Sequence, residues 1–162
     1  MTPELLASLA SQNFNRIPVT RELLADTETP LSVYLKLAGG KNSYLFESVQ
    51  GGEKWGRYSL IGLSTSTVLK ITGNQLEIVR DGKPLVNRTT DDALAEVERF
   101  RRLFRMPALE ALPRFTGGLV GYFGYDTVRY VEPKLAASAP LDDLGTPDIL
   151  LMASDEVAGF DC

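Results

Sequence analysis

A chain of 162 residues with 44% hydrophobic and 23% charged residues has the composition of an ordinary globular domain rather than of a disordered or membrane protein. No apolar run approaches the ~20 residues that a membrane helix needs, and the net charge of −4 lacks the basic excess of a nucleic-acid binder. The chain contains no histidine, which excludes Ser-His-Asp and Cys-His catalysis and imidazole metal ligands within it.

The amino terminus and the cysteine content indicate the compartment. Glu4 comes early, with no basic start and no long apolar block, so a secretory signal is not expected. The single cysteine, Cys162, cannot form an internal disulfide, which fits a reducing environment. The sequence therefore predicts a cytoplasmic protein.

Three helices are predicted in chain order. Thr-Pro pairs at 2–3 and 29–30 provide an N-cap and a first-turn proline for helices at 3–12 and 30–38. A third helix is expected at 90–104, where polar residues precede an apolar stripe with helical spacing.

The strands are predicted between and after these helices. Residues 16–20 are expected to be extended at a sheet edge, because Pro18 donates no hydrogen bond. Tight turns at 73–74 and 81–82 predict an antiparallel meander, and apolar runs around 154–156 predict a further hairpin. The expected strands are 44–49, 58–62, 65–72, 75–80, 84–86, 149–153 and 157–160.

The fold class that follows is α+β, with largely antiparallel strands in two packed sheets and helices outside them. Several strands lack an obvious cover, and the last one runs directly into Cys162. Unpaired edges are normally covered, so we expect a fragment of a longer protein; a naturally short protein is the alternative.

Charged clusters have structural explanations. The acidic pair at 91–92 suits the first turn of a helix, and the pair at 142–143 suits a loop, so neither is preferred as a metal site. The arginines between 99 and 105 are interpreted as a solvated helix face rather than a phosphate-binding patch.

Glycines recur in the aromatic segment Phe115 to Tyr130, at 118, 121 and 124. They do not match a nucleotide fingerprint, which opens a helix after a buried parallel strand. Glycine inside a strand indicates close approach of a neighbouring backbone, so these residues are expected to shape packing. Asp126 is expected to cap a following turn.

The segment from Tyr44 to Gly62 contains an inconsistency. Strand alternation places Glu47 on the same face as Leu45 and Val49, where a carboxylate is costly to bury without a partner. Such inconsistencies often mark functional sites. Simple exposure at a sheet edge is the alternative.

Three stretches together resemble a known family. LFES at 45–48, WGRYSLIG at 55–62 and FTGGLVGYFGYDTVRY at 115–130 resemble the amino-terminal region of anthranilate synthase component I. Its sister family, aminodeoxychorismate synthase component I, is a less similar alternative. A stand-alone small-molecule-binding module is the alternative from a different class.

The resemblance implies an enzyme that converts chorismate, with ammonia that a glutamine amidotransferase component supplies, into anthranilate and pyruvate in tryptophan biosynthesis. It also implies that the chorismate and magnesium residues lie in a carboxy-terminal domain outside these residues. Residues 1–162 are then the amino-terminal regulatory domain, which has no catalytic or metal-binding residue of its own and is inactive alone.

The same resemblance implies part of a feedback site for tryptophan. Ser48 and Glu47 match the family's serine motif, and Trp55, Arg57 and Tyr58 form the neighbouring wall. Glu47 can accept from an ammonium group and Arg57 can donate to a carboxylate, while aromatic and aliphatic side chains hold the indole. The rest of the pocket is expected from the missing domain.

Overall fold

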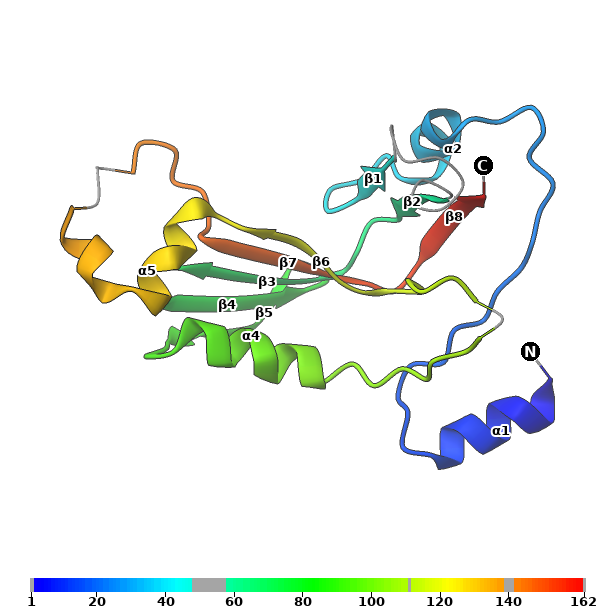
Figure 1. The fold of residues 1–162 in the computed structure, drawn as a ribbon, viewed down its shortest axis with the longest axis horizontal. Helices are drawn as coiled ribbons and strands as arrows, with labels where there is room; N and C mark the ends of the chain where they lie inside the picture. Colours follow the sequence, from blue (N-terminus) through cyan, green and yellow to red (C-terminus); the bar gives the residue numbers. More distant parts are fainter. Residues whose placement is uncertain (1, 48–57, 111, 139–141, 162) are drawn as a thin grey trace.

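The computed structural model describes residues 2–47, 58–110, 112–138 and 142–161 (Figure 1). The helical segments are α1 (Pro3–Ser11), α2 (Pro30–Leu37), α4 (Ala93–Arg102), α5 (Val128–Val131) and the 3₁₀ turns η1 (Tyr125–Thr127) and η2 (Pro133–Ser138). The strands are β1 (Tyr44–Phe46), β2 (Tyr58–Gly62), β3 (Thr67–Thr72), β4 (Gln75–Arg80), β5 (Lys83–Thr89), β6 (Gly118–Phe123), β7 (Ile149–Ser154) and β8 (Val157–Asp161).

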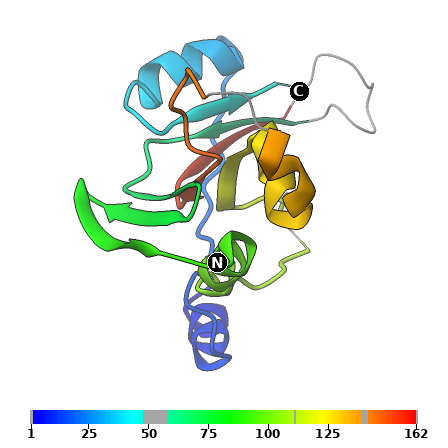
Figure 2. The ribbon, with the colours of Figure 1, turned by 90° about the vertical axis from the view of Figure 1, so that its left-hand side faces the viewer.

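The strands form two antiparallel sheets, which confirms the predicted α+β class. We call the three-stranded sheet, of order β1-β2-β8, sheet A and the five-stranded sheet, of order β5-β4-β3-β7-β6, sheet B. Helix α2 lies beside sheet A and α4 runs along sheet B, whereas α1 lies apart from both sheets (Figures 1 and 2).

The three long helices begin close to their predicted starts. The Thr2 hydroxyl accepts from the backbone of α1, and Thr29 forms a capping box with Ser32 at α2. Helix α4 begins at Ala93 rather than 90, because Asp92 is its N-cap and accepts from the Ala95 N–H at 2.8 Å. Side-chain capping of the free N–H groups thus sets all three starts.

Sheet B contains the predicted meander and most of the core. Strands β3, β4 and β5 follow one another through two-residue turns, and positive φ angles at Asp81 (51°) and Gly82 (73°) give the second turn the backbone twist that a tight hairpin needs. The face toward α4 forms one hydrophobic cluster, whose buried members are Leu69, Ile71, Leu76, Ala93, Phe100, Ile149, Leu151 and Ala153.

The predicted hairpin around residues 154–156 is wrong. Strand β7 pairs with β3 and β6, while β8 pairs with β2 in the other sheet. Both edges of β7 are therefore occupied, and no ladder position beside it remains for β8. The chain instead crosses from sheet B to sheet A at residues 154–156, which we call the joint.

Two smaller predictions also differ from the structure. Residues 16–20 have irregular backbone rather than an edge strand, and the Arg16 side chain pairs with Asp155 at the joint. Asp126 does not cap α5; it lies inside the 3₁₀ turn, and one of its carboxylate oxygens accepts from Arg129 at 2.6 Å. Thr127 occupies the N-cap position.

The glycine prediction is confirmed at Gly121. A Cβ at this residue would lie 1.9 Å from the carbonyl oxygen of Leu150 on the paired strand. Only a residue without a side chain permits that approach of β6 to β7.

A membrane span requires a helix that is both long and apolar. None of the described helices meets both requirements.

Candidate functional site

The structure describes two of the five predicted tryptophan-site residues. Ser48, Trp55 and Arg57 lie outside the described residues. Glu47 directly follows β1 and Tyr58 begins β2. Because β1 and β2 are antiparallel, with Phe46 opposite Leu60, Glu47 and Tyr58 lie at the same end of the ladder.

Glu47 is exposed, so its carboxylate carries no burial cost among the described residues. The alternation predicted for this strand is confirmed for its first residues: the rings of Tyr44 and Phe46 share a face, with centroids 4.9 Å apart. Tyr44 is buried while Phe46 is 52% exposed. Strand β1 therefore has its anchor at one end and the candidate ligand residue at the other.

Tyr44, at the first position of β1, connects sheet A to sheet B. Its hydroxyl forms a 2.8 Å hydrogen bond with the hydroxyl of Ser154, and both residues are buried. Burial raises the pKa of the Tyr44 phenol, and the hydrogen bond with Ser154 partly offsets the rise. The phenol thus stays protonated and acts as a hydrogen-bonding group, not as a base.

Further bonds hold the joint. The Leu63 N–H, just after β2, donates to the Glu156 carbonyl at 3.1 Å. The Thr65 hydroxyl donates to the carbonyl of Ala153, and the Thr65 N–H donates to the Asn42 carbonyl at 3.1 Å, just before β1. The segment linking β2 to β3 is therefore fixed to both sheets.

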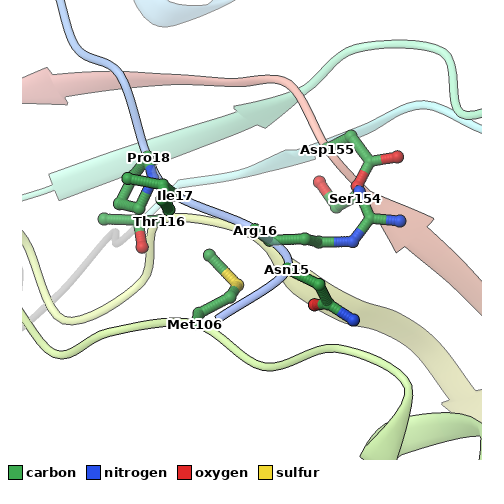
Figure 3. A pocket seen from close by; sticks show the side chains of 8 residues that line it. All are labelled: Asn15, Arg16, Ile17, Pro18, Met106, Thr116, Ser154 and Asp155. Atoms are coloured by element: carbon green, nitrogen blue, oxygen red, sulfur yellow. The ribbon is translucent and has the colours of Figure 1, made fainter. Parts of the chain in front are cut away.

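Ser154 also lines a pocket of about 230 Å³, together with Arg16 and Asp155 (Figure 3). The side chain of Arg16 reaches across it and pairs with the carboxylate of Asp155. The Arg16 guanidinium also lies 4.6 Å from the ring centroid of Phe104, a cation–π contact. The Arg16 guanidinium is thus already paired with the Asp155 carboxylate and the Phe104 ring.

Asn15 fixes the same segment to the end of α4. Its side-chain amide donates to the Leu103 carbonyl at 2.7 Å and accepts from the Arg105 N–H at 2.9 Å. The Asn15 N–H returns a bond to the Arg105 carbonyl at 3.1 Å. Residues 15–16 therefore join the amino-terminal segment, α4 and the joint.

The charged clusters have the structural roles expected of them. Asp92 caps α4, and the Asp142 carboxylate accepts from two N–H groups of its own loop. Arg101 and Arg102 both pair with Glu98 on the surface of α4, which confirms the solvated helix face.

Glu96 is a buried carboxylate that the sequence did not single out. It pairs with Arg88 of β5 at 2.9 Å and with Arg99, and it accepts from the Thr90 hydroxyl at 3.2 Å. Burial alone would raise the pKa of Glu96, but the hydrogen bonds from Arg88 and Arg99 outweigh it and hold the pKa below 4.5. This group ties α4 to the edge of sheet B.

Tyr130 holds α5 against the β3–β4 turn. Its hydroxyl lies 2.8 Å from both the Gly73 carbonyl and the Asp148 carboxylate, which also accepts from the Gly73 N–H at 2.7 Å. Burial, together with the Asp148 carboxylate, raises the pKa of Tyr130. The cluster is a structural tie, because its polar groups satisfy one another.

Apart from Glu96, whose partners are near it in the chain, the residues that sequence reasoning missed contact one another across long separations. Arg16 meets Asp155 across 139 positions and Tyr44 meets Ser154 across 110. No spacing rule relates such pairs. The one available signal was the glycine at 62, which leaves space for the Tyr44 ring.

The described residues thus define an α+β domain in which two antiparallel sheets meet at a joint. No model of a known protein family matches the chain. The chain is 55% identical over 161 residues to anthranilate synthase component 1 of Pseudomonas putida, and 56% identical over 161 residues to the protein of that name from Pseudomonas aeruginosa. Both matches cover 99% of this chain and 33% of the relative.

Relatives with lower sequence identity have the same name. The Aquifex aeolicus protein is 45% identical over 153 residues, covering 93% of this chain and 30% of the relative. A solved structure, anthranilate synthase component I from Streptococcus pneumoniae, matches 88% of this chain and 29% of its own with a TM-score of 0.46 and 24% identity. The resemblance stated from the motifs is confirmed, and the chain spans about a third of the length of these relatives.

Proposed function

We propose that the chain is the amino-terminal part of an anthranilate synthase component I, and that this part contributes to a feedback site for tryptophan. One observation carries the proposal: more than half of the residues are identical to proteins of that name across 99% of this chain. The complete protein would form anthranilate and pyruvate from chorismate, with a glutamine amidotransferase component supplying ammonia, in the cytoplasm.

The contribution of this chain would be regulatory. Glu47 and Tyr58 lie at one end of the β1–β2 ladder, where an exposed carboxylate can accept from the ammonium group of an amino acid. Ser48, Trp55 and Arg57 are proposed as the further residues of this half-site. Residues of the remaining part of the complete protein would close the pocket.

Magnesium is implied for the complete enzyme. Among the described residues, no three acidic or cysteine side chains gather closely enough to hold an ion, so the described residues do not fit that metal. We propose that its ligands, like those of chorismate, belong to the part of the complete protein outside this chain.

The first test is the coding sequence beyond Cys162. An open reading frame that continues for about two further lengths of this chain supports the proposal, whereas a stop codon directly after Cys162 supports a stand-alone module. Product analysis of the complete protein with chorismate and an ammonia source then distinguishes anthranilate from aminodeoxychorismate. Aminodeoxychorismate as the product would place the protein in the sister family.

The regulatory site has its own test. Replacing Ser48 by a bulky residue in the complete protein, as Ser48→Phe, is expected to abolish tryptophan binding in calorimetry while anthranilate formation persists. Undiminished tryptophan binding would remove Ser48 from the site. The isolated chain is expected to bind tryptophan weakly or not at all, because half of the pocket is absent.

A further inference from the structure

We propose that Tyr44 is a positioning residue for the tryptophan half-site: its hydrogen bond to Ser154 holds strand β1 against the joint and thereby fixes where Glu47 lies. The inference rests on the proposed function of this site. Four features of β1 and its surroundings carry it.

The first feature is the shortness of β1 and its position at the edge of sheet A. The strand has three residues, and its ladder partner is β2. Among these three residues, Tyr44 is buried, Leu45 is half-buried and Phe46 is exposed. A short edge strand has few main-chain bonds, so one buried side chain contributes a large share of what keeps it in place.

The second feature is the contact of the Tyr44 ring with Gly62. The two residues are register partners, and a Cβ at position 62 would lie 1.8 Å from the Cε1 atom of Tyr44. The ring therefore occupies the space of the missing side chain. A slip of β1 by two residues would bring Leu60, which shares this face, beneath the ring, and the two would collide.

The third feature is the rigidity of the anchor at the hydroxyl end. Ser154 is the last residue of β7, opposite Gly118 of β6, and it is 3% exposed. Strand β7 has a partner on each side and carries Ile149, Leu151 and Ala153 into the main core. Tyr44 is thus tied to one of the most fixed strands of the molecule.

The fourth feature is the packing around the tie. Tyr44 forms a second hydrophobic cluster with Val68, Val120 and Met152 of sheet B. Removing only the phenol oxygen leaves this cluster and the Gly62 contact intact. The hydrogen bond can therefore be tested separately from the packing.

Loss of the hydrogen bond between Tyr44 and Ser154 should weaken tryptophan binding, because β1 would be held less often in the position that binds the ligand. When only a fraction of the molecules holds β1 correctly, the apparent dissociation constant rises in inverse proportion to that fraction. Losing one buried hydrogen bond changes the equilibrium between held and displaced β1 by roughly threefold to tenfold, and this factor is the upper limit of the change in the apparent dissociation constant. Because the groups that act on chorismate are proposed to lie outside this chain, turnover without tryptophan should not change.

The experiment compares Tyr44→Phe, Ser154→Ala and the double variant in the complete protein. Tryptophan dissociation constants are measured by calorimetry, and kcat and KM for chorismate are measured without tryptophan. Each single variant is expected to bind tryptophan more weakly, by up to about tenfold, with kcat and KM within about twofold of the parent. Because one bond is lost in each case, the double variant should bind no more than about twofold more weakly than the weaker single variant.

Tyr122→Phe is the matched control, since it removes the same oxygen from a more exposed tyrosine on sheet B. It should leave the tryptophan dissociation constant unchanged. An unchanged constant in both Tyr44→Phe and Ser154→Ala would overturn the proposal. So would a parallel loss of turnover and binding, which would indicate a general folding defect.

Failure of the proposed function gives a different result. If the parent protein does not bind tryptophan, the half-site assignment fails, and the tie is then tested by amide hydrogen exchange. Tyr44→Phe should speed exchange at residues 44–46 about threefold to tenfold while β7 stays protected. Unchanged exchange at β1 would refute the tie itself.

Discussion

Sheets A and B differ in what holds them together. Sheet B has five strands against α4, and Leu69, Ile71, Ile149 and Ala153 have no exposed surface. Among the described hydrophobic side chains of sheet A, only that of Ile61 is equally buried. Sheet B is stabilised by a continuous hydrophobic core, whereas sheet A depends on a few specific ties to its neighbour.

The difference matters because the two described candidate ligand residues lie at sheet A: Glu47 directly follows β1 and Tyr58 begins β2. A strand fixed by few contacts can be displaced at a small cost in free energy. This property suits the proposed regulatory site, where ligand binding has to alter the position of a part of the protein. A strand inside a dense core cannot move without losing many contacts at once. The following predictions test this contrast between the sheets.

The largest effect is expected in the core of sheet B. Leu69→Ala removes a fully buried core side chain of β3, the central strand of sheet B, and should cost about 2 to 5 kcal/mol of unfolding free energy, because it leaves a cavity. Urea denaturation of the complete protein measures the cost. Phe46→Ala, at a half-exposed ring of sheet A, is the control and should cost clearly less. Equal losses would show that sheet A has a core comparable to that of sheet B.

A somewhat smaller loss is expected where two strands of sheet B approach closely. Gly121→Ala places a methyl group 1.9 Å from the Leu150 carbonyl oxygen, so the β6–β7 pair must separate locally. The cost should be about 1 to 3 kcal/mol, as for other overpacked sites. Wild-type stability in this variant would mean that β6 is free to shift.

Sheet B is also the part that the sequence predicted well. The meander followed from two tight turns with alternating apolar residues, and the residues opposite one another in β3 and β4 are close in the chain. Gly121 was predicted as a packing glycine for the physical reason that the structure bears out. Local propensity and tertiary packing agree here, so local reasoning was sufficient.

Sheet A and the joint could not be predicted in the same way. Strand β8 pairs with β2, about a hundred positions earlier in the chain, and a local rule paired it with β7 instead. Whether β7 has a free edge depends on β3 and β6, which sequence spacing does not reveal. For the candidate site, the motif predicted Glu47 and Tyr58 as ligand residues, which stays a prediction, whereas the hydrogen bond between Tyr44 and Ser154 forms only when distant strands meet.

A pH-dependent effect is expected where α4 meets the edge of sheet B. The pKa of Glu96 is held below its ordinary value of 4.5 in the folded protein. Its contribution to stability is therefore fully present above about pH 4.5 and is lost as the pH falls through the lowered pKa. Wild type should lose more stability than Glu96→Gln as the pH falls from 6 to 3, measured by urea midpoints.

The control for this prediction is Glu98, on the exposed face of the same helix. Hydrogen bonds from Arg101 and Arg102 lower the pKa of Glu98 to about 2, but its exposed pairs are screened by salt. Adding about 0.5 M salt should reduce the effect of Glu98→Gln more than that of Glu96→Gln. Equal salt sensitivity would mean that solvent reaches the Glu96 pair as freely.

The smallest effect is expected at a glycine of sheet A. A Cβ at Gly159 of β8 would meet no atom within 4 Å, and its φ lies outside the left-handed region. Gly159→Ala should therefore change the unfolding free energy by no more than about 0.5 kcal/mol, or raise it slightly because alanine loses less backbone entropy on folding. The same substitution at Gly121 is costly because a neighbouring backbone fills the space. Suppose that the unfolding free energy fell as much for Gly159→Ala as for Gly121→Ala. Strand β8 would then be covered in the complete protein as tightly as β6 is here, and the contrast between the sheets would hold only for this chain by itself.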